Sequence, residues 1–323
     1  MLTKTAKSIF LWFVASALFT GIMTAGSDQA PLGTLIDVGG YRVHLYCTGE
    51  RGPAVVVVGG GFSFDWGLVQ PKVAGLTRIC TYDPSGTAWS DPPPLPGTPN
   101  CSDRIAEIHE TLRRASVGGP LVIVGFSIGG LYGRLYASRY PGDVAGLVIV
   151  DHAFINPDHP PRPSETRAES VSQTTHPRGV FSVGEVDTPP SLITQAPVAL
   201  GIEDDQNFQR LPKRNRDLHL WAMSQNPIRP TAETAAECTA EVEQETGTAA
   251  YPLGTRPLVV ISTPNDSAEY QRLQAKLLLL SRDAKQIVAE RSTHMVIVDA
   301  PDTIIAAIEQ VVTSIRNGAA LEK

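Results

Sequence analysis

A serine between two glycines stands at the centre of the most informative stretch of this sequence. The five residues from Gly125 to Gly129 read Gly-Phe-Ser-Ile-Gly; they follow the apolar run Leu121–Val124 and precede small and apolar residues at helical spacing. A strand, a tight turn and a helix in this order form the G-x-S-x-G nucleophile elbow. Without side chains at Gly125 and Gly129 the turn avoids a clash, and the Ser127 hydroxyl stands clear at the helix N-terminus, which favours developing negative charge. The pattern predicts that Ser127 is a nucleophile.

A serine hydroxyl needs a neighbouring base, because it is a weak nucleophile at neutral pH. Histidine suits this role, since its imidazole titrates near working pH and can take the proton and then return it to the leaving group. Among the seven histidines of the chain, His294 follows the last predicted strand and precedes a helix. Sheets of alternating strands and helices hold their sites in such loops. We therefore expect His294 to be the general base for Ser127.

A carboxylate should hold the imidazole in one tautomer and stabilise its charged form. Two aspartates that follow predicted strands are candidates. Asp151 ends the run Val148–Val150, and Asp266 follows the run Leu258–Ile261. Either one gives the chain order serine, acid, histidine, so the residues alone leave both open.

The elements that must position these side chains alternate along the chain. Eight runs read as strands: Leu35–Val38, Tyr41–Cys47, Ala54–Val58, Thr77–Tyr82, Leu121–Val124, Ala145–Val150, Leu258–Ile261 and Gln286–Ala289. The run Ala54–Val58 is too apolar to have a solvent face, as expected in a parallel sheet covered on both sides. Helical patterns include Asp103–Ala115, with Ser102 placed to cap it, and also Gln206–Met223 and Ala232–Thr246. The alternation predicts an α/β fold.

Composition and spacing argue against several kinds of partner. Of the 323 residues, 42% are hydrophobic and 19% charged, and the net charge is -6 without a basic stripe. This is typical of a globular chain with a large core and argues against nucleic acid as a ligand. No cysteine or histidine pair has the spacing of a metal site, and no glycine-rich loop of the dinucleotide or Walker type follows a strand. The sequence predicts no metal, no cofactor and no nucleic-acid partner.

Residues 1–27 form a separate N-terminal segment. Two lysines precede the uncharged apolar stretch Ile9–Ala25, and small residues follow it. This is the layout of a signal peptide, although Met23 matches the −3 position of a cleavage site poorly. The stretch also reaches the roughly 17-residue lower limit of a membrane span, and a buried helix is a further alternative. We expect that the protein is exported, either to the periplasm or out of the cell. Alternatively, residues 9–25, and no other segment, anchor it in a membrane.

Together these features resemble the α/β-hydrolase family over about residues 33–315. The similarity includes Tyr82–Ser90, which is close to the family's D-x-x-G-x-G-x-S turn except that Ala88 replaces the second glycine. It also includes the closing segment Ser292–His294, followed by an apolar run and the predicted helix Pro301–Arg316. In the family, the histidine after the last strand is the general base.

The resemblance implies a mostly parallel eight-stranded sheet with helices on both faces and an inserted, largely helical cap. The core would consist of residues 33–152 and 251–317. Residues 153–250 are rich in proline and do not continue the strand–helix pattern, and they would form the cap or lid over the site. A loosely ordered surface excursion is the alternative for this range.

The resemblance also ranks the remaining site residues. Family members usually carry the acid at the spacing of Asp266, which is our first choice, while some use the position of Asp151, the alternative. Asp83 belongs to the structural turn and is expected to brace it. The oxyanion hole would use the backbone amide of Ile128 and that of Gly61, which lies where the family often shows His-Gly-x. Because the donors are backbone amides, the missing histidine need not remove the function.

The four cysteines can pair in three ways. In the family's sheet, the strand that ends at Cys47 neighbours the strand that holds Cys80, so these two can form a disulfide. Cys101 and Cys238 would then remain to tie the core to the cap. Export would allow this oxidation; the alternative is that Cys47 and Cys80 are small buried hydrophobes.

The resemblance implies a serine hydrolase that forms an acyl-enzyme on Ser127. A carboxylic ester hydrolase acting on a small molecule with an acyl or ester group is the first expectation. A C–C bond hydrolase or an aminopeptidase would use the same three side chains, and a silent homologue that only binds a ligand is a different class. Epoxide and haloalkane hydrolases on this fold use an aspartate nucleophile, so Ser127 argues against both.

Overall fold

The computed structural model describes residues 30–94, 98–152, 202–225, 227–230, 232–246, 250–264 and 268–322. Contacts divide the chain after Ala30, and the elements below belong to the unit Pro31–Lys323. The segment 1–27 lies outside the described residues, as do residues 153–201 of the expected cap. Within the described ranges, no helix combines the length and the apolar character needed to cross a membrane.

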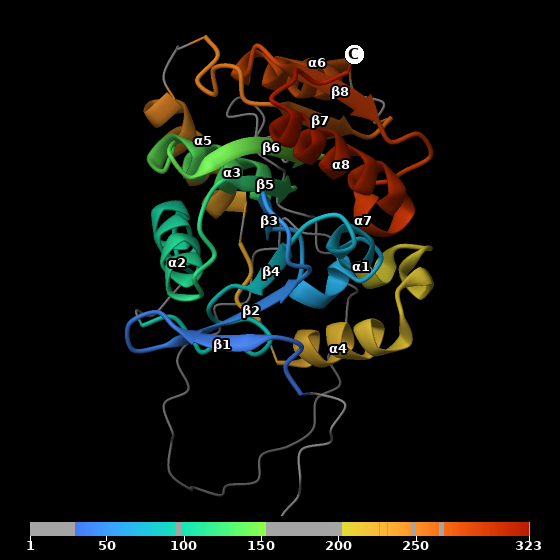
Figure 1. Ribbon diagram of the computed structural model, residues 1–323. Coiled ribbons are helices and arrows are strands. Elements are labelled where there is room, and N and C mark those ends of the chain that lie inside the picture. The colour runs from blue at the N-terminus through green and yellow to red at the C-terminus, as the bar shows by residue number, and fades with distance from the viewer. Residues whose placement is uncertain are drawn as a thin grey trace, which may run out of the picture. The chain divides into compact units, whose positions relative to one another are not determined.

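An eight-stranded, mostly parallel sheet forms the centre of the fold (Figure 1). Its strands are β1 (Thr34–Asp37), β2 (Arg42–Thr48), β3 (Ala54–Val58), β4 (Ile79–Asp83), β5 (Leu121–Phe126), β6 (Val144–Val150), β7 (Leu258–Ser262) and β8 (Ala284–Val288). They lie in the order β1-β2-β4-β3-β5-β6-β7-β8. β2 is antiparallel to β1 and β4, and the pairs from β4 to β8 are parallel. The loops after the parallel strands therefore meet at one edge of the sheet.

Helices cover both faces of this sheet. They are α1 (Gln70–Ala74), α2 (Cys101–Arg114), α3 (Gly129–Arg139), α4 (Lys213–Ser224), α5 (Ala232–Thr246), α6 (Ala268–Lys276), α7 (Val296–Asp299) and α8 (Pro301–Asn317), with 3-10 turns η2 (Ser63–Trp66), η3 (Ile202–Asp204), η4 (Phe208–Arg210) and η5 (Leu277–Leu280). In β3, Val56 and Val58 join the apolar cluster under α2, α3 and α5, whereas Val55 and Val57 join the cluster under α1, α7 and α8 (Figure 1). Burial on both faces explains why these strands have no polar alternation.

The start of α2 differs from the expectation. The helix begins at Cys101, and its N-cap is Asn100, whose side chain accepts a hydrogen bond from the Asp103 amide at 2.8 Å. The Asp103 carboxylate accepts in return from the Asn100 amide at 3.2 Å, which completes a capping box. Ser102, the expected cap, lies inside the helix, and its hydroxyl donates to Glu241 of α5. The prediction of Ser102 as the cap was wrong because Asn100 offers the same chemistry two residues earlier.

The described part of the expected cap divides between two places. α4 packs on η2, beside the loop that follows β3. α5 instead packs against α2 and α3, with Ala235, Cys238 and Val242 fully buried in the core cluster. These three residues recur at helical spacing and give α5 one apolar stripe, so the helix joins the core layer. The range 153–250 therefore contains both an element near the site and an element of the core.

Two disulfides join all four cysteines of the chain. Cys47 and Cys80 occupy paired positions on the antiparallel strands β2 and β4, with their Cα atoms 4.0 Å apart. Cys101 at the start of α2 pairs with Cys238 of α5, with a Cα separation of 5.3 Å. These are the two pairs that the family resemblance implies.

Candidate active site

The turn after β5 holds Ser127 in a strained conformation. Its φ is 55°, in the left-handed region that non-glycine residues seldom adopt. A Cβ on Gly125 would lie 2.2 Å from the Gly129 carbonyl oxygen, and a Cβ on Gly129 would lie 1.9 Å from that of Val58. The Gly130 amide donates to the Ser127 carbonyl at 3.0 Å, and α3 continues from there. The two glycines thus allow the close approach that the motif requires, with Ser127 at its apex.

His294 lies in the loop between β8 and α7 and is held by a carboxylate. Its Nδ1 lies 2.6 Å from Oδ2 of Asp151, which directly follows β6 and is only 3% exposed. Thr263, after β7, donates its hydroxyl to the other oxygen of Asp151 at 3.1 Å. A carboxylate accepts, so His294 donates from Nδ1, and Nε2 keeps its lone pair for a proton from another group.

The carboxylate that accepts from His294 is therefore that of Asp151, the alternative to our first choice. The first choice, Asp266, lies outside the described residues, and nothing about its side chain enters this geometry. β6 and β7 are neighbours in the sheet. The loops that follow these two strands therefore begin at the same edge of the sheet, which explains why the sequence alone did not separate the two candidates.

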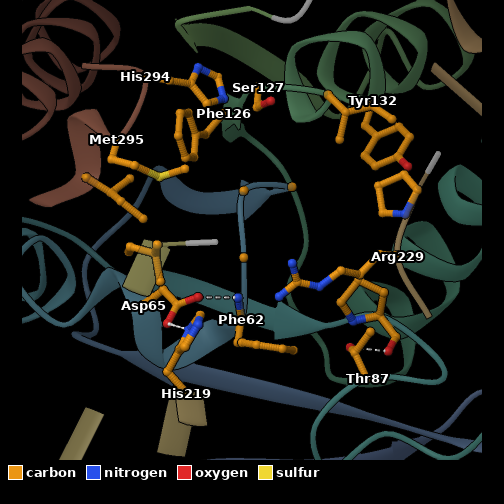
Figure 2. A pocket seen from close by; sticks show the side chains of 18 of the residues that line it. Phe62, Asp65, Thr87, Phe126, Ser127, Tyr132, His219, Arg229, His294 and Met295 are labelled. Carbon is orange, nitrogen blue, oxygen red and sulfur yellow. Dashed lines mark hydrogen bonds and ion pairs between the residues drawn. The ribbon is translucent and has the colours of Figure 1, made fainter. Parts of the chain in front are cut away.

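One pocket contains Ser127 and His294 (Figure 2). In the figure, the His294 imidazole and the Ser127 hydroxyl lie at the same end of the pocket, where Phe126 and Met295 also lie. The Phe126 and His294 ring centroids are 5.0 Å apart. Most of the lining is apolar and includes Phe62, Pro84, Ile128, Ile202, Ile228, Pro230 and Ile297. Such a lining excludes water and favours the apolar part of an acyl compound.

The loop after β3 supplies backbone to the same pocket. Gly59, Gly60 and Gly61 all have positive φ values, 72°, 73° and 93°, and all three line the pocket together with Ile128. A Cβ on Gly61 would lie 2.3 Å from Oδ2 of Asp65, an oxygen that accepts from the Phe62 amide at 2.8 Å. The amide of Phe62 is thus already used. The two expected oxyanion donors, Gly61 of this loop and Ile128 of the elbow after β5, both lie on the pocket wall.

Asp83 holds the start of η2, which follows the glycine loop after β3, in place. Its buried carboxylate accepts from the amide and the hydroxyl of Ser63 at 2.7 and 2.9 Å, and from Nδ1 of His44 at 2.7 Å. Nε2 of His44 accepts in turn from the Gly33 amide at 2.9 Å. The turn after β4 and the start of η2 are therefore fixed to each other, as expected of a structural aspartate.

Sequence reasoning gave no role to His219, which the structure places in the pocket wall. This residue of α4 is 2% exposed, and its two ring nitrogens lie 2.8 Å from Asp65 and 2.8 Å from Glu203. Burial lowers the pKa of His219, but the charge of Asp65 and the hydrogen bonds to both carboxylates outweigh it and raise the pKa above its usual value. A protonated imidazole donates from both nitrogens and joins α4 to the loop after β3. No local sequence signal connects residues so far apart in the chain.

Buried polar groups also lie behind the elbow. His152 follows Asp151 and is 2% exposed; burial, with a smaller effect of Arg134, lowers the pKa of His152 to about 3. It is therefore neutral at physiological pH. Within the described ranges, no cluster of three or more histidine, cysteine or acidic side chains could hold a metal ion.

Known proteins share the fold and part of the sequence of this chain. The sequence profile of a family described as alpha/beta hydrolase fold matches residues 53–301. The human (lyso)-N-acylphosphatidylethanolamine lipase is 31% identical over 122 residues, which cover 37% of this chain and 35% of that protein. An uncharacterized protein of Schizosaccharomyces pombe is 37% identical over 84 residues, 26% of this chain and 15% of that one. This chain therefore spans well under two thirds of the length of these relatives.

Solved structures agree in fold over nearly the whole chain. A putative lipase from Acinetobacter baumannii has a TM-score of 0.59, at 15% identity, and the alignment covers 90% of this chain and 94% of that one. A thermophilic esterase from Thermogutta terrifontis has a TM-score of 0.58, at 16% identity, with 85% and 94% covered. At 15–16% sequence identity, these structures show a shared fold and nothing about a shared activity.

Proposed function

Because this chain belongs to the α/β-hydrolase family and is a hydrolase, we propose that it cleaves carboxylic esters through an acyl-enzyme on Ser127. The main support is the hydrogen bond of 2.6 Å from His294 to the buried Asp151, together with the pocket that His294 and Ser127 both line. A lipase among the relatives and an esterase among the structural neighbours favour an ester over other acyl compounds. A C–C bond hydrolase or an aminopeptidase would use the same three side chains.

The first half of the reaction forms the acyl-enzyme. The Ser127 oxygen attacks the ester carbonyl while its proton passes to Nε2 of His294, and Asp151 stabilises the resulting imidazolium. The carbonyl oxygen becomes an oxyanion, for which the amides of Ile128 and Gly61 are the proposed donors. When the tetrahedral intermediate collapses, the bond to the alcohol oxygen breaks and the alcohol leaves with the proton from His294.

The second half releases the acid. Water attacks the acyl carbonyl and gives one proton to His294, and the same two amides receive the oxyanion. The bond to the Ser127 oxygen then breaks, and His294 returns the proton to that oxygen. The products are an alcohol and a carboxylic acid, and the enzyme is restored.

A fluorophosphonate probe tests the nucleophile. We expect the probe to label the wild-type protein and to leave Ser127→Ala unlabelled, since the probe forms a covalent bond with an activated serine. Hydrolysis of p-nitrophenyl esters of increasing chain length should then give the preferred acyl length. If neither protein is labelled and no ester is cleaved, a protein that only binds a ligand is the better interpretation.

We also propose that the protein is exported. All four cysteines lie in disulfides, which form and persist in oxidising compartments. Cell fractionation, with mass spectrometry of the N-terminus, would show whether the chain leaves the cytoplasm and whether residues 1–27 are removed. Protein found in the cytoplasm with reduced cysteines would contradict this proposal.

A further inference from the structure

We propose that Arg229 binds an anionic group of the substrate, so that the preferred ester carries a carboxylate or a phosphate at a distance from the scissile bond. This inference rests on the proposed function and specifies its substrate. Arg229 lines the same pocket as Ser127 and His294. Figure 2 shows its guanidinium pointing into the pocket, between the Ser127 end and the end formed by Asp65 and His219.

The backbone around Arg229 is held in place. The Ile228 amide donates to the Gly86 carbonyl at 3.0 Å. The Ile228 side chain packs against Gly86 so closely that a Cβ on Gly86 would lie 2.5 Å from Cδ1 of Ile228. Pro227 and Pro230 flank this pair and restrict the backbone φ on both sides. The half-buried Arg229 side chain therefore starts from a fixed point on the pocket wall.

The guanidinium of Arg229 has weak partners. Its contacts are the Met223 sulfur and the ring of Phe62, whose centroid lies 6.0 Å from the guanidinium carbon. Among the residues that the structure describes, no carboxylate forms an ion pair with it. Arg104, the other arginine of the pocket, differs: it binds the Glu107 carboxylate at 3.0 Å and the Ser85 hydroxyl at 2.9 Å. Arg229 thus keeps donors available to a ligand.

Two carboxylates at the His219 end of the pocket already have a partner. Asp65 and Glu203 both accept from His219, each at 2.8 Å. Burial raises the pKa of Glu203, but its own backbone amide, His219 and, through space, Arg229 together lower it. Arg229 therefore acts on Glu203 by its charge, while its hydrogen bonds are left for another acceptor.

The rest of the pocket explains why the ligand should be anionic. The lining of the pocket is largely apolar, with Ile128, Tyr132, Ile202, Ile228, Met295 and Ile297 among its members. A guanidinium in such surroundings is poorly hydrated and pairs strongly with an oxyanion, often through two parallel hydrogen bonds. An apolar chain between the ester and a terminal anion would fill both parts of the pocket.

Matched substrates test the proposal. One is the mono-p-nitrophenyl ester of adipic acid, which has a free carboxylate; the other is its methyl ester, which is neutral and similar in length. We expect the wild type to prefer the anion and Arg229→Gln to lower the ratio of kcat/KM, anion to neutral, by about 10- to 100-fold. Arg229→Lys should keep part of the preference. Arg282→Gln is the control, because Arg282 also lies over an aromatic ring, Tyr251 at 5.0 Å, but does not line the pocket.

The outcomes separate the two proposals. If Ser127-dependent hydrolysis is present but Arg229→Gln leaves the ratio unchanged, or the wild type prefers the neutral ester, the role of Arg229 is overturned and the esterase stands. If no ester is cleaved and no probe labels Ser127, the proposed function itself fails.

Binding gives a second readout that needs no turnover. Calorimetry measures the affinity of Ser127→Ala for monomethyl adipate and for hexyl phosphate. The ligand that binds more tightly shows whether the pocket prefers a carboxylate or a phosphate. Loss of that binding when Arg229→Gln is added supports the proposal. Equal binding with and without Arg229 overturns it.

Discussion

The hydrogen bond between Asp151 and Nδ1 of His294 fixes which ring nitrogen faces the substrate side. An asparagine at position 151 would offer an amide in place of the carboxylate and would favour the tautomer with its proton on Nε2, which cannot accept from Ser127. We expect Asp151→Asn to lower kcat on a p-nitrophenyl ester by about 1,000- to 10,000-fold. KM should change little, since Asp151 does not line the pocket.

Asp266→Asn is the matched control for this prediction. Asp266 follows β7 in the sequence as Asp151 follows β6, and it was the first choice from the family spacing. We expect Asp266→Asn to keep most of the activity. Collapse of turnover in Asp266→Asn alone would show that the contact of Asp151 with His294 is structural.

His219 allows a prediction on stability and pH. Its pKa in the folded protein is raised, by Asp65 and Glu203 against the effect of burial. The stabilisation of the fold by protonated His219 is therefore complete below the pKa of histidine in the unfolded chain, about 6.5. It is lost as the pH rises through the pKa of His219 in the folded protein. His219→Gln should lower the free energy of unfolding by about 1–3 kcal/mol at acidic pH, and by less at alkaline pH. Thermal melts over this range measure it; a Tm difference that grows with pH would mean that His219 is neutral when folded.

The elbow between β5 and α3 carries a prediction at the scale of an element. A Cβ on Gly129 would lie 1.9 Å from the Val58 carbonyl oxygen, a backbone atom that cannot move without β3. We expect Gly129→Ala to lose fluorophosphonate labelling and to destabilise the fold by several kcal/mol, on the order of an overpacked core. Gly133→Ala is the control in the same helix, since its Cβ would meet only the Ile123 side chain at 3.2 Å. Loss of labelling in Gly133→Ala but not in Gly129→Ala would contradict this account of the turn.

Local patterns were enough to predict most elements of the core. The strand that enters the elbow and the helix α5 appear where the sequence places them, since the strand is a continuous apolar run and the helix has apolar residues at helical spacing. The environment of α5 did not follow from the same pattern. Its stripe of Ala235, Cys238 and Val242 fits any apolar surface, and only the tertiary structure shows that α2 and α3 supply that surface.

At the scale of the whole molecule, the site combines segments that the sequence indicated to different degrees. Ser127 and His294 follow from motifs next to strands. The positions of His219 and Arg229 in the same pocket depend on how the segment after residue 202 folds back over the loop after β3. That return path has no periodic signal in the sequence, so the charged part of the pocket was not predictable.

The two disulfides constrain the whole chain to different extents. Cys47–Cys80 closes 33 residues, and Cys101–Cys238 closes 137; the loops do not overlap, so their effects should add. A longer loop restricts the unfolded chain more, and the chain-entropy relation gives the longer one an advantage of about 1 kcal/mol. We expect Cys101→Ser with Cys238→Ser to lower the free energy of unfolding by about 4–5 kcal/mol, more than the serine pair at 47 and 80. Urea unfolding of both double variants measures the difference. If the shorter loop proves the more stabilising, contacts of β2 with β4 in the native state, and not the entropy of the unfolded chain, would determine the contribution of these bonds.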